Sequence, residues 1–127
     1  MTHYLIDAVG CIQTGNNDAV EQMLSKMVEY CGCRELQRVH HAFEPFGYTA
    51  VVLLAESHLS CHTWPETERA CIDLFTCGKA RVDVDVLKRI VSEHLGGSSS
   101  VQVFQRGQSM VTLWPRRQWR NNRHTKE

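Results

Sequence analysis

Residues 48–76 read YTAVVLLAESHLSCHTWPETERACIDLFT, and they decide the fold of this chain. The segment contains three short runs rich in apolar residues, which we predict to be strands: 48–55, 58–64 and 69–76. A break at Glu56-Ser57 separates the first two runs, and Pro65-Glu66 separates the second from the third. Connections this short join neighbouring strands, so the segment predicts the middle of a β-sheet.

Further runs of the same kind extend the sheet on both sides of this segment. We predict additional strands at residues 3–9, 35–44 and 101–105, and another around 110–114. The turn between the strand at 35–44 and the central segment contains Pro45-Phe46-Gly47.

Two segments show the three-to-four-residue spacing of an amphipathic helix. The first carries Val20, Met23, Leu24, Met27, Val28 and Cys31 on one face. Asn17 or Asp18 can cap its start, and Gly32 can end it in a left-handed turn. The second begins near Asp83 or Asp85 and ends at Gly96-Gly97; its inward residues are Val84, Leu87, Ile90, Val91 and Leu95.

The order of these elements is β-α-β-β followed by β-β-α-β. Such an order predicts an α+β fold, a two-layer sandwich in which helices cover one face of a mostly antiparallel sheet. With 127 residues, of which 43% are hydrophobic, the chain has enough apolar material for one core.

Composition excludes several classes of function. The formal net charge is +0, so nucleic-acid binding and attachment to a membrane surface are not indicated. No apolar run approaches the roughly 18–20 residues of a membrane span, and the first residues lack a secretion signal. We therefore expect a cytoplasmic protein whose six cysteines are free thiols.

Residues 54–66 concentrate side chains that suit chemistry: two serines, two histidines, a cysteine and acidic residues. Side chains alternate along a strand, so His58 and His62 share one face and Ser57 falls on the other. If Ser57 and His62 act together, the backbone at Glu56-Ser57 must leave the regular strand. We expect a tight turn or a strained peptide there.

A zinc site is a weaker alternative for the same histidines and for the cysteines. Cys31 and Cys33 are spaced too closely for the usual C-x2–4-C ligand pair. His58 and His62 have a spacing that suits a metal only on a helix, and their segment is predicted to be a strand. We therefore expect no metal.

Several ordered motifs together resemble one enzyme family. They are His3-Tyr4-Leu5-Ile6-Asp7 with Gly10-Cys11, Phe43-Glu44-Pro45-Phe46-Gly47, Ala55-Glu56-Ser57-His58, His62-Thr63-Trp64-Pro65-Glu66, Asp73-Leu74-Phe75-Thr76-Cys77-Gly78 and Phe104-Gln105-Arg106-Gly107. In sequence and spacing they resemble the prokaryotic S-adenosylmethionine decarboxylases. Those enzymes make a covalent pyruvoyl cofactor by cleaving their own chain before a serine.

The resemblance implies self-cleavage between Glu56 and Ser57, with Ser57 as the precursor of the pyruvoyl group. It implies that His62 is an acid or base in processing and that Cys77 is the proton donor in decarboxylation. Thr49 matches, less closely, a hydroxyl residue near the cleavage site.

The resemblance also implies a substrate and a partner. Glu66 matches an acid that holds the ribose hydroxyls, and Phe43 matches an aromatic residue that stacks on adenine. S-adenosylmethionine is then the expected substrate, for polyamine (spermidine) synthesis, and the expected assembly is a homodimer with active sites at the subunit interface. The match spans about residues 3–107, so we expect a decarboxylase-like domain over 1–107 and an extension with a basic tail over 108–127.

Other interpretations stay open. The segment Thr67-Glu68-Arg69-Ala70-Cys71 departs from the family pattern beside the expected pocket, and relatives of this fold decarboxylate arginine or ornithine. A homologue that never cleaves, a binding or regulatory subunit, is a further alternative. Each expected site residue also has an ordinary structural explanation: a turn serine, a hydrogen-bonded histidine, a buried cysteine, a surface carboxylate and a core phenylalanine.

Overall fold

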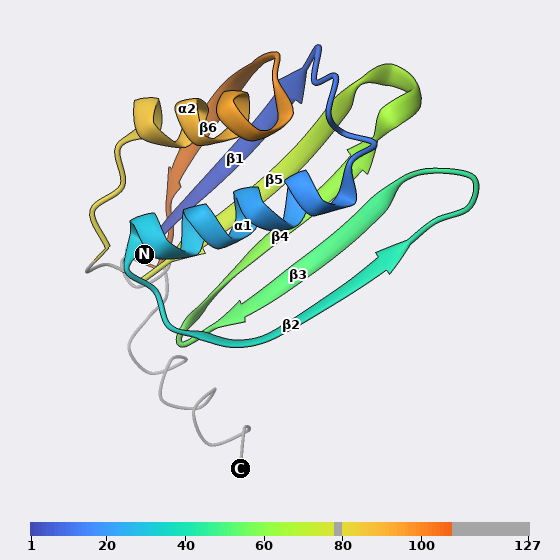
Figure 1. The fold of residues 1–127 in the computed structure, drawn as a ribbon. Coiled ribbons are helices and arrows are strands. Elements are labelled where there is room, and N and C mark those ends of the chain that lie inside the picture. Colours follow the sequence, from blue (N-terminus) through green and yellow to red (C-terminus); the bar gives the residue numbers. More distant parts are fainter. Residues whose placement is uncertain (78–79, 108–127) are drawn as a thin grey trace.

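A computed structural model describes residues 1–77 and 80–107 of the chain. Its elements, in chain order, are β1 (Thr2–Val9), α1 (Asn17–Cys31), β2 (Glu35–Ala42), β3 (Tyr48–Leu54), β4 (Ser57–Trp64), the short 3-10 helix η1 (Pro65–Thr67), β5 (Arg69–Thr76), α2 (Val84–Leu95) and β6 (Ser98–Gln105). Figure 1 shows the two α-helices lying on the same side of one twisted sheet.

The sheet has the strand order β2-β3-β4-β5-β1-β6, and every neighbouring pair is antiparallel. Residues 48–76 supply β3, β4 and β5, three adjacent strands in the middle of the sheet. The architecture therefore confirms the predicted α+β sandwich with helices on one face of an antiparallel sheet.

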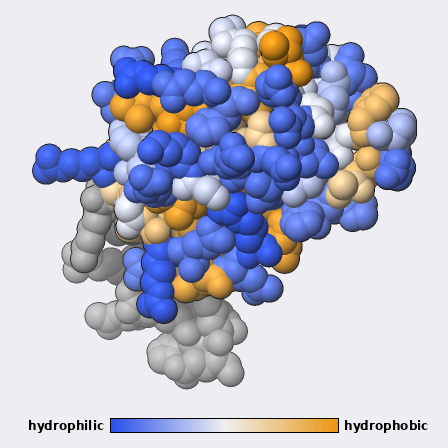
Figure 2. Space-filling view, viewed as in Figure 1, coloured by the Kyte–Doolittle hydropathy of each residue, from blue (hydrophilic) through white to orange (hydrophobic). Residues whose placement is uncertain are grey.

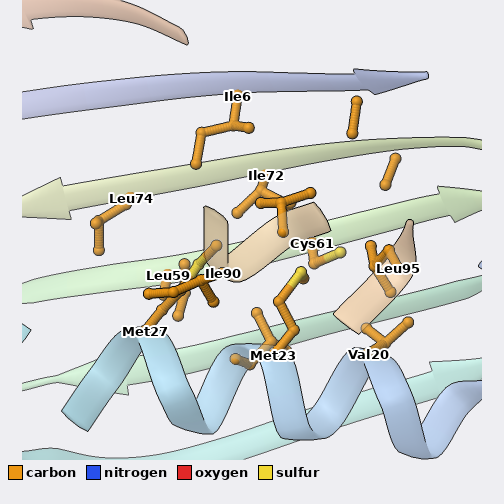
Figure 3. Packing of buried hydrophobic residues seen from close by; sticks show 14 of the residues in the cluster. Ile6, Val20, Met23, Met27, Leu59, Cys61, Ile72, Leu74, Ile90 and Leu95 are labelled. Atoms are coloured by element: carbon orange, nitrogen blue, oxygen red, sulfur yellow. The ribbon is translucent and has the colours of Figure 1, made fainter. Parts of the chain in front are cut away.

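The core lies between the sheet and the two helices (Figure 3). Burial alternates strictly along β4, as expected for a strand with one covered face. On the covered side, Leu59 and Cys61 of β4 pack with Met23 and Met27 of α1, all of them fully buried. Ile90 of α2 joins the same cluster. This packing fixes which residues of β4 face the helices and which face away.

The first helix begins one residue earlier than the sequence indicated. Asn16, not Asn17 or Asp18, is the N-cap, and its side-chain oxygen accepts a hydrogen bond from the Ala19 N–H at 3.1 Å. The predicted end is confirmed, because Gly32 has φ +65° and continues the chain in a left-handed turn.

Of the two predicted element starts between residues 80 and 107, one is confirmed and one is wrong. The second helix starts after an Asp83 cap, as expected, but β6 begins at Ser98 and includes the serines that were predicted to precede it. They join the strand because β6 pairs with β1 along its whole length, from Ser98 opposite Val9 to Gln105 opposite Thr2. The strand predicted at 110–114 and the basic tail lie outside the described residues. Neither described helix is long and apolar enough to cross a bilayer.

The side of the molecule that carries the helices is largely hydrophilic, with separate hydrophobic spots (Figure 2). We call the opposite side of the sheet the open face, because neither described helix covers it. The open face exposes Val39 of β2, Val51 and Leu53 of β3, and Phe104 of β6. Val39 and Val51 are directly paired, so these two side chains adjoin each other across the strands.

Candidate active site

The expected cleavage position lies in the turn between β3 and β4. Leu54 pairs with Ser57, so Ala55 and Glu56 form a two-residue connection, which we call the cleavage turn. Glu56 has φ +70°, a left-handed conformation that is uncommon for a residue with a side chain. The sequence prediction of a tight or strained turn at this position is confirmed.

Ser57 begins β4 with its side chain on the helix-covered side of the sheet. The residue is only 8% exposed, and its Oγ has no hydrogen-bond partner of regular geometry among the described residues. An unpaired buried hydroxyl is costly, by about 1–3 kcal/mol. A hydroxyl kept in this state directly after a left-handed residue fits a reactive group better than an ordinary turn serine.

Cys77 lies near this hydroxyl at the end of the neighbouring strand. His58 of β4 pairs with Phe75 of β5, so the register brings Ser57 to Thr76, the last residue of β5, and Cys77 follows Thr76 directly. The Cys77 side chain is half-buried. The structure therefore brings together Ser57 and Cys77, two of the three predicted catalytic residues.

A third polar side chain, Cys33, adjoins this pair and was missed by the sequence analysis. The Ala55 N–H in the cleavage turn donates to the Arg34 carbonyl at 2.9 Å, which holds the segment after α1 against the turn. Burial raises the pKa of the Cys33 thiol, the nearby Cys77 raises it further, and the Ser57 hydroxyl lowers it. Cys33 is therefore a neighbour of both residues.

His62 lies elsewhere. It is exposed on the open face, where its Nδ1 and the Thr49 Oγ1 are 2.9 Å apart in a hydrogen bond. Thr49 is directly opposite His62 across the β3–β4 pair. On the other side, His62 pairs with Cys71, whose thiol donates to the Asp7 carboxylate at 3.3 Å. The imidazole thus belongs to a polar row that crosses the open face.

Beside His62 is a hollow of about 390 Å³. Its lining comprises Phe43, Phe46, Gly47, Thr49, His62, Thr63, Trp64 and Glu66, and we call it the aromatic hollow. Phe43 is 50% exposed, so it is not a core residue. Three aromatic side chains and one carboxylate around an open hollow are suited to a ligand with a flat ring and hydroxyl groups.

The expected site residues thus form two separate groups in one chain. Ser57 and Cys77 lie at one end of β4 and β5, whereas His62, Thr49, Phe43 and Glu66 lie at the other end. Ser57 and His62 are five positions apart on β4, or about 16 Å at roughly 3.3 Å per residue. Their side chains also point to opposite faces. No single chain in this conformation assembles the whole set.

The open face holds one further polar feature that the sequence analysis did not single out. His3 of β1 lies edge-on to Phe75, with ring centroids 5.8 Å apart, and its Nε2 is buried without a hydrogen-bond partner among the described residues. Burial lowers the pKa of His3, with smaller contributions in the same direction from Arg106 and His58 and an opposing one from Asp73. No three potential ligands among the described residues are grouped to hold a metal ion.

Comparison with solved structures defines the class of this fold. The crystal structure of the adenosylmethionine decarboxylase from Aquifex aeolicus aligns with a TM-score of 0.69 and 31% sequence identity, covering 84% of this chain and 89% of that one. The sheet with helices on one face is therefore the fold of a decarboxylase.

Sequence comparison gives the family. The sequence model of S-adenosylmethionine decarboxylase matches residues 2–107. The S-adenosylmethionine decarboxylase proenzyme of Methanococcus vannielii is 40% identical over 90 residues, which cover 69% of this chain and 74% of that relative. The proenzyme of the same name from Aquifex aeolicus is 35% identical over 108 residues, covering 83% and 79%. The chain belongs to the S-adenosylmethionine decarboxylase family.

Proposed function

We propose that this chain is the precursor of a pyruvoyl-dependent S-adenosylmethionine decarboxylase that cleaves itself between Glu56 and Ser57. Beyond the family match, the main support for the proposal is the conformation of the cleavage turn. A left-handed Glu56 is followed by a buried Ser57 hydroxyl without a regular hydrogen bond, next to the Cys77 thiol.

Self-cleavage begins when the Ser57 Oγ attacks the carbonyl carbon of Glu56. A C–O bond forms, the C–N bond breaks, and the hydroxyl proton moves to the released amine, which leaves an ester. Loss of the Ser57 α-proton then breaks the Cβ–Oγ bond and frees the Glu56 carboxylate. Hydrolysis of the resulting dehydroalanine releases ammonia and leaves a pyruvoyl group at residue 57.

The surroundings of Ser57 suit a pyruvoyl group. The Ser57 side chain is buried, and the half-buried Cys77 thiol at the end of the neighbouring strand can deliver a proton to a substrate carbon. A pyruvoyl group supplies an electron sink for the carbanion that remains when carbon dioxide leaves. The chain's own residues bind the substrate, exclude water and move protons.

A complete site requires a second copy of the chain. The Ser57 and Cys77 end needs an acid or base and a binding surface, and the aromatic hollow with His62 lacks a reactive group. Two copies packed through their open faces, about a two-fold axis that runs across the strands, would place the Ser57 end of one beside the His62 end of the other. The apolar Val51 and Leu53 on that face would be buried in such a homodimer.

In this arrangement each hollow would bind the adenosyl part of the substrate. Phe43 would stack on adenine, and the Glu66 carboxylate would accept hydrogen bonds from the ribose hydroxyls. Thr49, hydrogen-bonded to His62 Nδ1, would fix the orientation of that imidazole for processing. The family match ends at residue 107, which supports a decarboxylase domain over 1–107 and a separate extension beyond it.

The test is the intact mass of the freshly purified protein under denaturing conditions, with Ser57→Ala in parallel. The expected result is two fragments, 1–56 and 57–127, the second starting with a pyruvoyl group, and a single uncut chain for the variant. Release of carbon dioxide from S-adenosylmethionine, arginine and ornithine, each labelled at the carboxyl carbon, then identifies the substrate.

Two other results would change the proposal. A single uncut 14.5 kDa chain for the unaltered protein would show a homologue that keeps the fold without cleaving. Cleavage with release from arginine or ornithine, and none from S-adenosylmethionine, would keep the pyruvoyl mechanism and replace the proposed substrate.

A further inference from the structure

His41 lies on the open face beside the aromatic hollow and has no part in the contacts proposed so far. It belongs to β2 and is directly opposite Thr49 of β3, the residue that is hydrogen-bonded to His62. Side chains directly opposite each other share one face of a sheet, so His41 extends the polar row that crosses the open face. Its side chain is exposed, and it is not one of the residues that line the hollow. An effect of His41 on a bound ligand therefore has to pass through a neighbouring residue.

That neighbour is Phe43, the ring proposed to stack on adenine. The rings of His41 and Phe43 meet edge to face, with their centroids 4.6 Å apart and an angle of 70° between their planes. Edge-to-face contact is one of the arrangements that aromatic pairs prefer. Phe43 is half-exposed all the same. The contact with His41 thus orients the Phe43 ring and leaves much of it accessible from the hollow.

The backbone next to Phe43 is fixed by the turn between β2 and β3. The Phe43 N–H donates to the Gly47 carbonyl at 2.9 Å. A Cβ added to Gly47 would lie 3.7 Å from the Phe43 Cβ and 3.9 Å from its Cδ2, so the glycine backbone packs against the base of this side chain. With the backbone held in this way, the freedom that remains is rotation of the side chain. The imidazole of His41 restricts that rotation.

We propose that His41 is a positioning residue for the adenosyl group, and that its imidazole holds the Phe43 ring in the orientation in which adenine stacks on it. A half-exposed side chain can change rotamer, and fixing it only when the ligand arrives costs affinity. The edge-to-face contact restrains the ring before binding. The inference rests on the proposed function, because it concerns the hollow assigned to the adenosyl part of the substrate. It adds to that hollow a residue outside its lining.

His40 provides a contrast within the same strand. Its ring stacks on that of Tyr48, with centroids 5.6 Å apart and an angle of 21° between the planes. Tyr48 is buried on the helix-covered side of the sheet, and successive residues of a strand point to opposite faces. His40 therefore lies on the face away from the hollow. Replacing it removes the same chemical group from the same strand, which makes His40→Ala the matched control.

The experiment measures binding of 5′-methylthioadenosine, which contains adenine and ribose but no carboxylate or ammonium group, by isothermal titration calorimetry. All proteins carry Ser57→Ala, so each is a single uncut chain and binding does not depend on cleavage. We expect His41→Ala to weaken binding about three- to tenfold, the effect of losing one edge-to-face pair. His41→Phe, which keeps a ring at this position, and His40→Ala should bind as tightly as the chain with Ser57→Ala alone.

A second comparison shows whether His41 acts through Phe43. In chains that also carry Phe43→Ala, His41→Ala should have no further effect, because the ring that it positions is gone. A further loss of the same size in these chains would overturn the proposal. Unchanged binding by His41→Ala would overturn it as well, and so would an equal weakening by His40→Ala or His41→Phe.

Cleavage is a separate measurement, made by intact mass in chains that keep Ser57. His41→Ala should yield the fragments 1–56 and 57–127 at the unaltered rate. An unaltered chain that stays uncut would overturn the proposed self-cleavage, but the binding comparison would still decide the role of His41. If Phe43→Ala binds 5′-methylthioadenosine as tightly as the chain with Ser57→Ala alone, or if neither binds it, the hollow is not the adenosyl site and this inference fails with that assignment.

Discussion

Ser57 and His62 lie five positions apart on the same strand, β4, with their side chains on opposite faces of the sheet. Ser57 faces the helices, whereas His62 faces outward beside Thr49. If both residues take part in self-cleavage, as the family resemblance implies, the histidine must come from a second chain.

This arrangement predicts complementation between two inactive variants. Ser57→Ala has no nucleophile, and His62→Ala lacks the imidazole, so each alone should stay uncut. In a mixed dimer, the Ser57 of the His62→Ala chain meets the intact His62 of the Ser57→Ala chain. Co-expression should therefore produce cleaved His62→Ala chains, at most one in each mixed dimer, detected by intact mass with a size tag on one variant.

The control for this experiment is the double variant Ser57→Ala/His62→Ala co-expressed with His62→Ala. That pair contains no intact imidazole and should yield no fragments. If His62→Ala chains remain uncut beside Ser57→Ala, although the two are recovered together in one dimer, then His62 does not act across the interface.

The backbone of Glu56 predicts opposite effects of two substitutions on stability. Glycine adopts φ +70° without steric cost, so Glu56→Gly should raise the free energy of unfolding by about 0.5–1 kcal/mol. A β-branched residue is poorly suited to that conformation, so Glu56→Val should lower it by about 1–2 kcal/mol. Urea unfolding in a Ser57→Ala background measures both without interference from cleavage. Equal midpoints for the three chains would show that the turn is not strained.

The sequence was sufficient for the fold because the relevant signals are local. Alternating burial in residues 48–76 and the apolar face of α1 each follow from a short window of residues. The start of β6 was wrong because long-range pairing decides it: β6 extends to Ser98 because β1 offers partners along its whole length.

For the candidate site, too, local patterns predicted some features, and contacts between distant segments could not be predicted. Strand alternation placed Ser57 and His62 on opposite faces in advance, and the need for a turn at Glu56 followed from it. The proximity of Cys33 to Ser57 was not predictable, because it depends on how the end of α1 meets a turn more than twenty residues later. No local pattern around Cys33 carries that information.

Alkaline pH should destabilise the fold through its buried thiols. The pKa of a free thiol is 9.0. Mainly through burial, the pKa of Cys61 is raised to about 12, and so is that of Cys31. Each thiol has a higher pKa in the folded chain than in the unfolded chain, so the folded state is favoured while the thiol stays protonated. This contribution to the free energy of unfolding is fully present below about pH 9 and is lost as the pH rises from 9 towards 12.

We therefore expect the urea midpoint of the Ser57→Ala chain to fall steadily between pH 9 and pH 11. Cys61→Ala in the same background should show a shallower decline, because one of the raised thiols is gone. Cys77→Ala is the comparison, since its half-buried thiol lies outside the core cluster. Parallel declines in all three proteins would mean that Cys61 does not titrate in the way its burial requires.

The aromatic hollow predicts a separation between substrate binding and self-cleavage. Glu66 lines the hollow at the His62 end, far along β4 from the cleavage turn. Glu66→Gln should raise the KM for S-adenosylmethionine by about 10- to 100-fold, the effect of losing a charged hydrogen bond of about 1.5–3 kcal/mol. Cleavage should proceed at the unaltered rate. Glu68→Gln, which removes an exposed carboxylate two residues away that does not line the hollow, should change neither quantity. Should Glu66→Gln slow cleavage and leave KM unchanged, the carboxylate would belong to processing, and the hollow would lose its assignment as the adenosyl site.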